Sequence, residues 1–248
     1  MADISRKVWN KYISVLRRIN DAAADAFREY LKTHDIKTRL QRDAAIQYAY
    51  ALATKYGEAS ADFAARMYES VAKASNVIIE DTIPAATATY EEVAKTINGT
   101  LKQSTNIDLI SGSVGRLVKQ AGVDTICKNA IRDEAEWAWI PSGDTCAFCL
   151  LLASNGWQRA SKTILNGGHA EHIHAHCDCT FAIRFNERTN VEGYNPKQYQ
   201  EMFEDAEGDT WDEKVNTIRR EHYAVHREEI LEQQKEAVEP QNQINEDS

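Results

Sequence analysis

The sequence predicts a mainly α-helical protein, in which long N-terminal helices are followed by a small α+β unit and then by C-terminal helices. Turn-forming residues are scarce, with 11 glycines and 4 prolines in 248 residues, whereas a β-sandwich or barrel needs a turn about every 8–12 residues. Apolar residues recur at helical spacing through the first half of the chain. Four of the five cysteines lie within residues 146–179, which sets that part of the chain apart.

Long amphipathic helices are expected over the N-terminal half. A second helix is predicted from an N-cap at Asp35 to a C′ glycine at Gly57, and a third over about residues 58–75. Pro84 suits the first turn of a fourth helix, and Asn98-Gly99 indicates a turn or a helix end. The first helix is predicted from an apolar stripe at spacings of three and four residues: Ile4, Val8, Tyr12, Leu16, Ile19, Ala23, Phe27 and Leu31.

Two strand patterns flank the cysteine-rich part of the chain. Glu136 to Ile140 is predicted as a short strand before a turn, and Thr180 to Phe185 as a half-buried strand, because its side chains alternate in polarity. Helices are predicted from Pro196 and from about Trp211, before a polar, disordered end. The predicted divisions are 1–128 (helical N-terminal domain), 129–190 (α+β unit), 191–237 (C-terminal helices) and 238–248 (disordered acidic tail).

The formal net charge of −9 argues against a protein whose main partner is naked nucleic acid. The charge is uneven, because residues 1–40 hold nine basic and five acidic side chains, whereas residues 227–248 hold two and seven. This asymmetry indicates a basic end and an acidic tail with different surroundings, or two ordinary solvated helix faces. No apolar run is long enough for a membrane span and no secretory signal is expected, so the cysteines should meet a reducing environment.

The cysteine cluster has the spacing of a zinc site. Cys146 and Cys149 form a C-x2-C pair on a predicted turn, and His174, Cys177 and Cys179 follow in an H-x-H-C-x-C pattern. Thiolate and imidazole donors favour Zn²⁺, and four protein ligands leave no open position for catalysis. The predicted ligands of this structural zinc are Cys146, Cys149, His174, and either Cys177 or Cys179, which makes residues 129–190 a zinc-binding unit. Reduced cysteines without a metal remain the alternative.

No catalytic residues are predicted. His169-Ala170-Glu171 matches the H-x-E of zinc deaminases, but those enzymes place it before the C-x2-C pair, whereas here the order is reversed. Cys127 stands apart from the cluster on a predicted helix, and we expect it to be a small buried apolar residue.

The segments Trp139 to Cys149, Ala153 to Gly156 and His174 to Thr180 resemble the C-terminal motif of MuF-like minor head proteins of tailed bacteriophages, particularly those of actinobacteria. The resemblance implies a protein present in few copies inside the procapsid, near the portal vertex. Its implied partners are the portal protein, the major capsid or scaffold protein and packaged DNA, with no membrane. Many relatives carry Arg where this chain has Asp178, which leaves the predicted ligands intact.

The resemblance therefore predicts a minor capsid, or head morphogenesis, protein that acts in procapsid assembly at the portal and in DNA packaging or ejection. The expected location is the capsid interior of the virion, with the host cytoplasm during assembly. Members of this group are often labelled capsid maturation protease, so a protease is one alternative, although the motif shows no protease constellation. A DNA-contacting factor near the portal, which would use the basic N-terminal helix, is the other.

Overall fold

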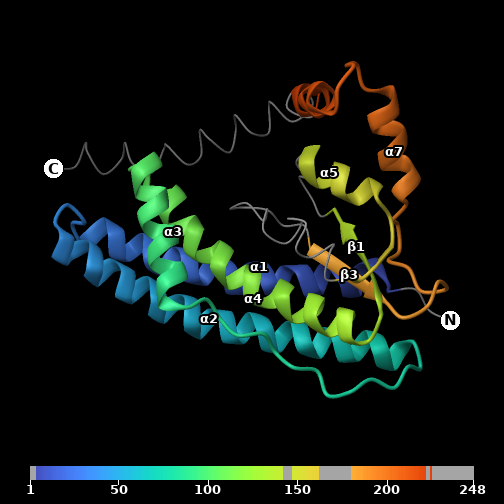
Figure 1. The fold of residues 1–248 in the computed structure, drawn as a ribbon, viewed down its shortest axis with the longest axis horizontal. Coiled ribbons are helices and arrows are strands. Elements are labelled where there is room, and N and C mark those ends of the chain that lie inside the picture. The colour runs from blue at the N-terminus through green and yellow to red at the C-terminus, as the bar shows by residue number, and fades with distance from the viewer. Residues whose placement is uncertain (1–3, 142–146, 162–179, 222–223, 225–248) are drawn as a thin grey trace, which may run out of the picture.

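Three long helices form the frame of the protein, seen here in a computed structural model (Figure 1). The structure describes residues 4–141, 147–161, 180–221 and 224. Helices α1 (Arg6–Thr33), α2 (Arg39–Ala74) and α4 (Ile107–Arg132) pack against one another along their lengths, and α3 (Tyr90–Gln103) packs on α2 and α4 at one end. Thr38 begins α2 and Thr89 begins α3, each through a reciprocal capping box.

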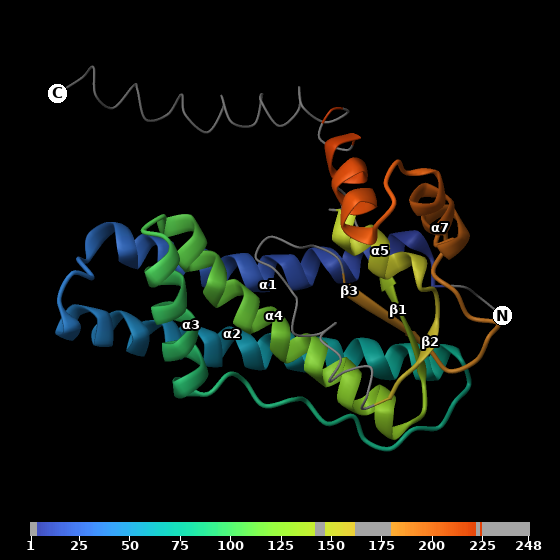
Figure 2. The same cartoon turned by 45° about the horizontal axis from the view of Figure 1, so that its top comes forward.

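A small sheet and shorter helices occupy the other end of the frame (Figure 2). The sheet is antiparallel, in the order β2-β1-β3, with Trp139 opposite Phe181. The elements are β1 (Glu136–Ile140), α5 (Ala147–Ser154), β2 (Gln158–Arg159), β3 (Thr180–Arg184) and α7 (Pro196–Asp205), and residues 211–221 are also helical. The strands predicted at 136–140 and from 180, and the helix predicted from Pro196, are confirmed.

Most residues of helix α4 are buried because the helix packs against both α1 and α2. Two of its glycines allow this close approach. A Cβ at Gly115 would lie 3.1 Å from the carbonyl oxygen of Asn20 in α1. A Cβ at Gly122 would lie 2.6 Å from the hydroxyl of Ser60 in α2. The frame therefore depends on the absence of side chains at these two contacts.

An extended segment, residues 77–89, which we call the strap, runs from α2 to α3 and is held by polar side chains of α4. The buried amide of Asn129 both accepts from Ile83 N at 3.1 Å and donates to the Ile83 carbonyl at 2.9 Å. One turn earlier, the hydroxyl of Thr125 accepts from Ala85 N at 2.9 Å. Arg132 donates to the carbonyl of Asp81. These side chains supply the partners that a neighbouring strand would otherwise provide.

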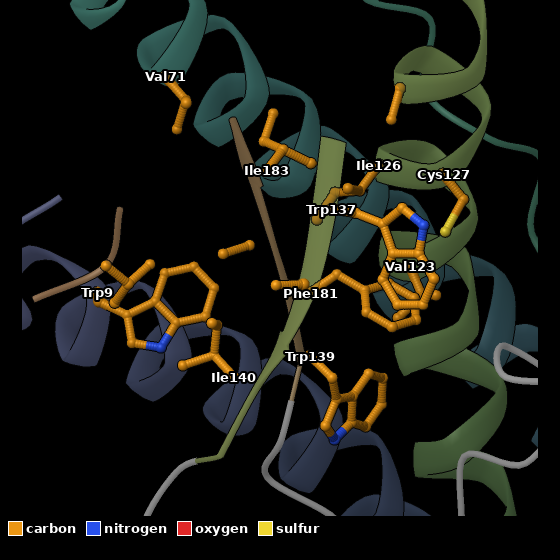
Figure 3. Close-up of a cluster of buried hydrophobic side chains, with 14 of the residues drawn as sticks. Trp9, Val71, Val123, Ile126, Cys127, Trp137, Trp139, Ile140, Phe181 and Ile183 are labelled. Carbon is orange, nitrogen blue, oxygen red and sulfur yellow. The ribbon is translucent and has the colours of Figure 1, made fainter. Parts of the chain in front are cut away.

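The sheet shares one hydrophobic core with the helical frame (Figure 3). Trp137 and Trp139 pack edge-on against Phe181, with ring centroids 4.7 and 4.6 Å apart, on the side that faces α4. Ile140 points the other way, toward Trp9 of α1. The strands are thus buried on both faces, unlike the half-buried strand predicted from the alternation after Thr180.

The predicted fold class was therefore wrong about a zinc-binding α+β unit. Among the described residues, no group of three or more His, Cys, Asp or Glu side chains could hold a metal ion. The metal was expected from the spacing of the cysteines and histidines, and in a small unit with little core of its own it would supply folding free energy. Instead, the sheet is stabilised by the same core cluster as α1, α2 and α4.

Several predicted helix boundaries were also wrong. Gly57 lies inside α2, where a Cβ would come within 2.9 Å of the Thr87 side chain, so the glycine lets the strap cross α2 rather than ending the helix. Pro84 lies in the strap, and Asn98-Gly99 lies inside α3. The stripe on α1 is correct for most positions, but Val8 is exposed and Ile4 precedes the helix and bridges to Val191. The predicted disorder of 238–248 falls outside the described residues.

Replacing Gly122 with alanine should destabilise the fold, because the new methyl group meets Ser60 of α2. We expect Gly122→Ala to lower the free energy of unfolding by about 1–3 kcal/mol. Gly99→Ala is the matched control, because a Cβ at Gly99 has no neighbour within 4 Å and should raise stability by about 0.5–1 kcal/mol through helix propensity. Urea unfolding followed by circular dichroism measures both. Equal effects of the two substitutions would contradict the close approach of α2 and α4.

Removing the Asn129 amide should release the strap while the helices stay folded. Asn129→Ala leaves both backbone groups of Ile83 without their partner, at a cost of about 1–3 kcal/mol. We expect hydrogen exchange at the Ile83 amide to accelerate strongly, with α1 and α2 unaffected. Asn98→Ala serves as the control, because Asn98 is exposed on α3. Unchanged protection of Ile83 would show that Asn129 does not hold the strap.

Candidate functional site

Most of the predicted metal ligands lie outside the part of the chain that the structure describes. Cys146, His174, Cys177 and Cys179 fall in residues 142–146 and 162–179, and Cys149 is the described member of the set. Cys149 lies on α5, 1% exposed, in the core shared by the sheet and the frame. The ligand set and its zinc ion therefore stay predictions from the sequence.

Helix α5 is buried because its residues are apolar all round. One side, with Cys149 and Leu152, belongs to the shared core, and the other, with Leu150, packs against Phe203 of α7. The last carbonyl groups of a helix lack partners within it. Here the hydroxyl of Tyr194 donates to the Ala153 carbonyl at 2.7 Å, and the Gln200 amide donates to the Ser154 carbonyl at 2.8 Å. The end of α5 is thereby held in place.

Cys127 is buried on α4, as the sequence predicted. Burial raises the pKa of its thiol, and the negative charge of Asp124 raises that pKa further. The thiol is therefore neutral at physiological pH. A neutral, buried thiol is a poor nucleophile and a poor metal ligand, so Cys127 serves packing.

A polar groove lies between α3 and α4. It has a volume of about 760 Å³. Its lining includes Lys95, Gly99 and Thr100 of α3, and Leu109, Arg116 and Leu117 of α4. We call this feature the α3–α4 groove. The lining combines two cations and one carboxylate with several hydroxyl groups and two leucine side chains.

The two cations of the groove lack counterions. Within the described ranges, neither Lys95 nor Arg116 has an ion pair or a hydrogen bond, and Arg116 is half-buried. Glu92 also lines the groove, but its carboxylate accepts from the Thr89 backbone N at 2.7 Å and from the Thr89 hydroxyl at 2.9 Å. Because that carboxylate is used in the capping box, the two cations remain available to an incoming anion.

Gly99 is one of the residues that line the groove. It lies in the interior of α3, where glycine costs about 0.5–1 kcal/mol relative to alanine, yet no neighbouring atom would touch its Cβ. Packing therefore does not explain this glycine. The sequence interpretation missed the groove, because it took Asn98-Gly99 for a turn. A glycine within a helical pattern, four residues after Lys95, was the signal that could have indicated it.

A second charged surface lies on the first turns of α1. Lys7, Lys11 and Arg18 are exposed and follow one another at spacings of four and seven residues, which places them on one helix face. No acidic residue occurs between Arg6 and Asn20. We call this surface the basic face of α1. Its three basic residues contribute to the net positive charge of residues 1–40.

The described residues form a mainly helical protein with a charged groove, a basic helix face and a pinned extended segment. The chain belongs to the VG15 protein family, whose family model matches residues 3–206. VG15 is a family of viral proteins, in agreement with a phage-type protein. No curated protein and no solved structure matches the chain. In the part of the chain that the structure describes, no helix is both long enough and apolar enough to cross a lipid bilayer.

Proposed function

We propose that the protein is a minor capsid protein of a tailed phage that acts in procapsid assembly at the portal. The observation that carries this proposal is the match to a viral family over residues 3–206. That range includes the complete stretch from Trp139 to Thr180, which resembles the motif of MuF-like minor head proteins, and the three-helix frame as well.

The strap provides a surface for contact with other head proteins. Ile78 is 99% exposed and Ile83 is 67% exposed, although α4 pins the backbone of the strap at Asp81, Ile83 and Ala85. Contiguous exposed apolar patches mark protein interaction sites. A pre-ordered segment also loses less conformational entropy on binding. We therefore assign the contact with the portal protein, or with the major capsid or scaffold protein, to the strap.

Charged substitutions in the strap should remove the protein from assembling heads. Phage that carries Ile78→Asp with Ile83→Asp should yield procapsids with at least tenfold less of this protein, as measured by quantitative mass spectrometry of gradient-purified particles. The matched control is Ala86→Asp, an exposed position of the same strap. If the unaltered protein is missing from purified procapsids and virions, the proposed function is wrong. If the double variant retains full incorporation, the assignment to the strap is wrong.

The basic face of α1 favours a second role, contact with packaged DNA. Lys7, Lys11 and Arg18 are exposed on one side of a helix that has no acidic residue in its first turns. Such a face can track phosphate groups through counterion release, even in a protein with an overall charge of −9. This role is compatible with a location inside the capsid.

Reversing these charges should weaken DNA binding in a salt-dependent manner. The triple variant Lys7→Glu, Lys11→Glu, Arg18→Glu should reduce the slope of log K against log salt by about 0.9 for each phosphate group that the protein no longer neutralises. Fluorescence anisotropy with duplex DNA measures the slope. The control reverses Arg66 and Lys73, which are exposed on α2. Binding by the native protein that does not change with salt would rule out a phosphate-driven contact.

A further inference from the structure

We propose that copies of this chain associate head to tail, with the acidic segment 201–213 of one copy seated in the α3–α4 groove of the next. This inference goes beyond the assembly role, because it identifies the partner of the groove as a second copy of the chain.

The acidic segment 201–213 combines strong negative charge with an exposed aromatic side chain. Trp211 is 61% exposed and Met202 is 39% exposed. The nearest basic group, Lys214, has its ammonium within 2.7 Å of the Phe203 carbonyl and 3.1 Å of the Glu204 carbonyl. The segment has no basic residue and seven exposed acidic ones: Glu201, Glu204, Asp205, Glu207, Asp209, Asp212 and Glu213. The Glu213 carboxylate already accepts from the backbone N of Asp209 and of Thr210, so the other six carboxylates are the ones offered to a partner.

The α3–α4 groove offers the complementary chemistry. Its cations Lys95 and Arg116 lack counterions among the described residues, and Leu109 and Leu117 provide an apolar floor. Sites of roughly 300–1,000 Å³ accommodate ligands of several rings, so a groove of about 760 Å³ can admit an indole. A tryptophan that enters a pocket between charged neighbours is the usual anchor of a protein interface. Trp211 supplies this anchor, and the surrounding carboxylates supply the charges.

The two surfaces lie at opposite ends of the molecule. In Figures 1 and 2, α3 lies at one end of the frame, and α7, which contains part of the acidic segment, lies at the other. The segment therefore cannot reach the groove of its own chain. A contact between two different surfaces is heterologous, and it repeats from copy to copy as a ring or an open filament.

The proposed contact explains why position 99 is a glycine. A side chain at this position would project into the open groove, since none of the described residues occupies that space. A larger residue such as leucine would therefore fill the groove without disturbing the frame. Gly99→Leu should preserve the fold and weaken self-association.

Sedimentation velocity of the full-length protein tests the proposal. It measures self-association of the native protein and of variants in which the charges of one surface are changed in sign. We expect the native protein to self-associate in a concentration-dependent manner, and more weakly at high salt. Reversing the charges of the groove (Lys95→Glu with Arg116→Glu) should abolish self-association. Glu204→Lys with Asp209→Lys leaves five acidic and two basic residues in the acidic segment, and should weaken self-association. A mixture of the two variants should associate again, because each then carries the surface that complements the other. Trp211→Ala should weaken association by at least about tenfold.

The control is Lys102→Glu, an exposed position of α3 outside the groove, which should associate like the native protein. Circular dichroism verifies that each variant is folded. A native protein that stays monomeric at every concentration overturns the inference, as does a mixture of reversed variants that fails to associate. Neither result bears on incorporation into procapsids, so failure of this inference is distinguishable from failure of the proposed function.

Discussion

The close approach of α4 to its two neighbours is the constraint on which the rest of the structure depends. At Gly115 and Gly122 the backbone of α4 comes so near to its neighbours that a Cβ would lie 3.1 Å from the Asn20 carbonyl oxygen of α1 and 2.6 Å from the Ser60 hydroxyl of α2. Protein interiors pack at the density of organic crystals. An added methyl group that displaced α4 would therefore disturb the packing of side chains along the whole helix. Because α4 packs against α1, α2 and α3, it determines where the other helices can lie.

The functional surfaces follow from that position of α4. Arg116 reaches the groove, Asn129 holds the strap, and the end of the helix leads directly into the sheet. The groove, the strap and the sheet therefore all contact one helix, which fixes their relative positions.

The sequence predicted the helical frame and the strands correctly where the pattern was local. Tyr12, Leu16 and Phe27 mark the buried face of α1, because burial of one helix face makes apolar residues recur every three or four positions. The alternation after Thr180 marks a strand, because successive side chains of a strand point to opposite faces. The errors arose at glycine and proline. Gly57 was expected to end a helix, but it lies inside α2 where the strap crosses. The sequence alone does not distinguish a glycine at such a crossing from a glycine that ends a helix. The metal ligands at Cys146 and its neighbours stay a prediction, because most of them lie outside the described residues.

The sequence by itself determined that the chain is mainly helical, where it changes from helices to strands, and which residue types carry the charges. Only the tertiary structure decided that the sheet shares its core with the helices, that the strap is pinned by α4, and that Lys95 and Arg116 meet across one groove. The physical reason is the range of the interactions. Periodicity and capping act over three or four residues, whereas these contacts join residues far apart in the chain, and no local pattern records them.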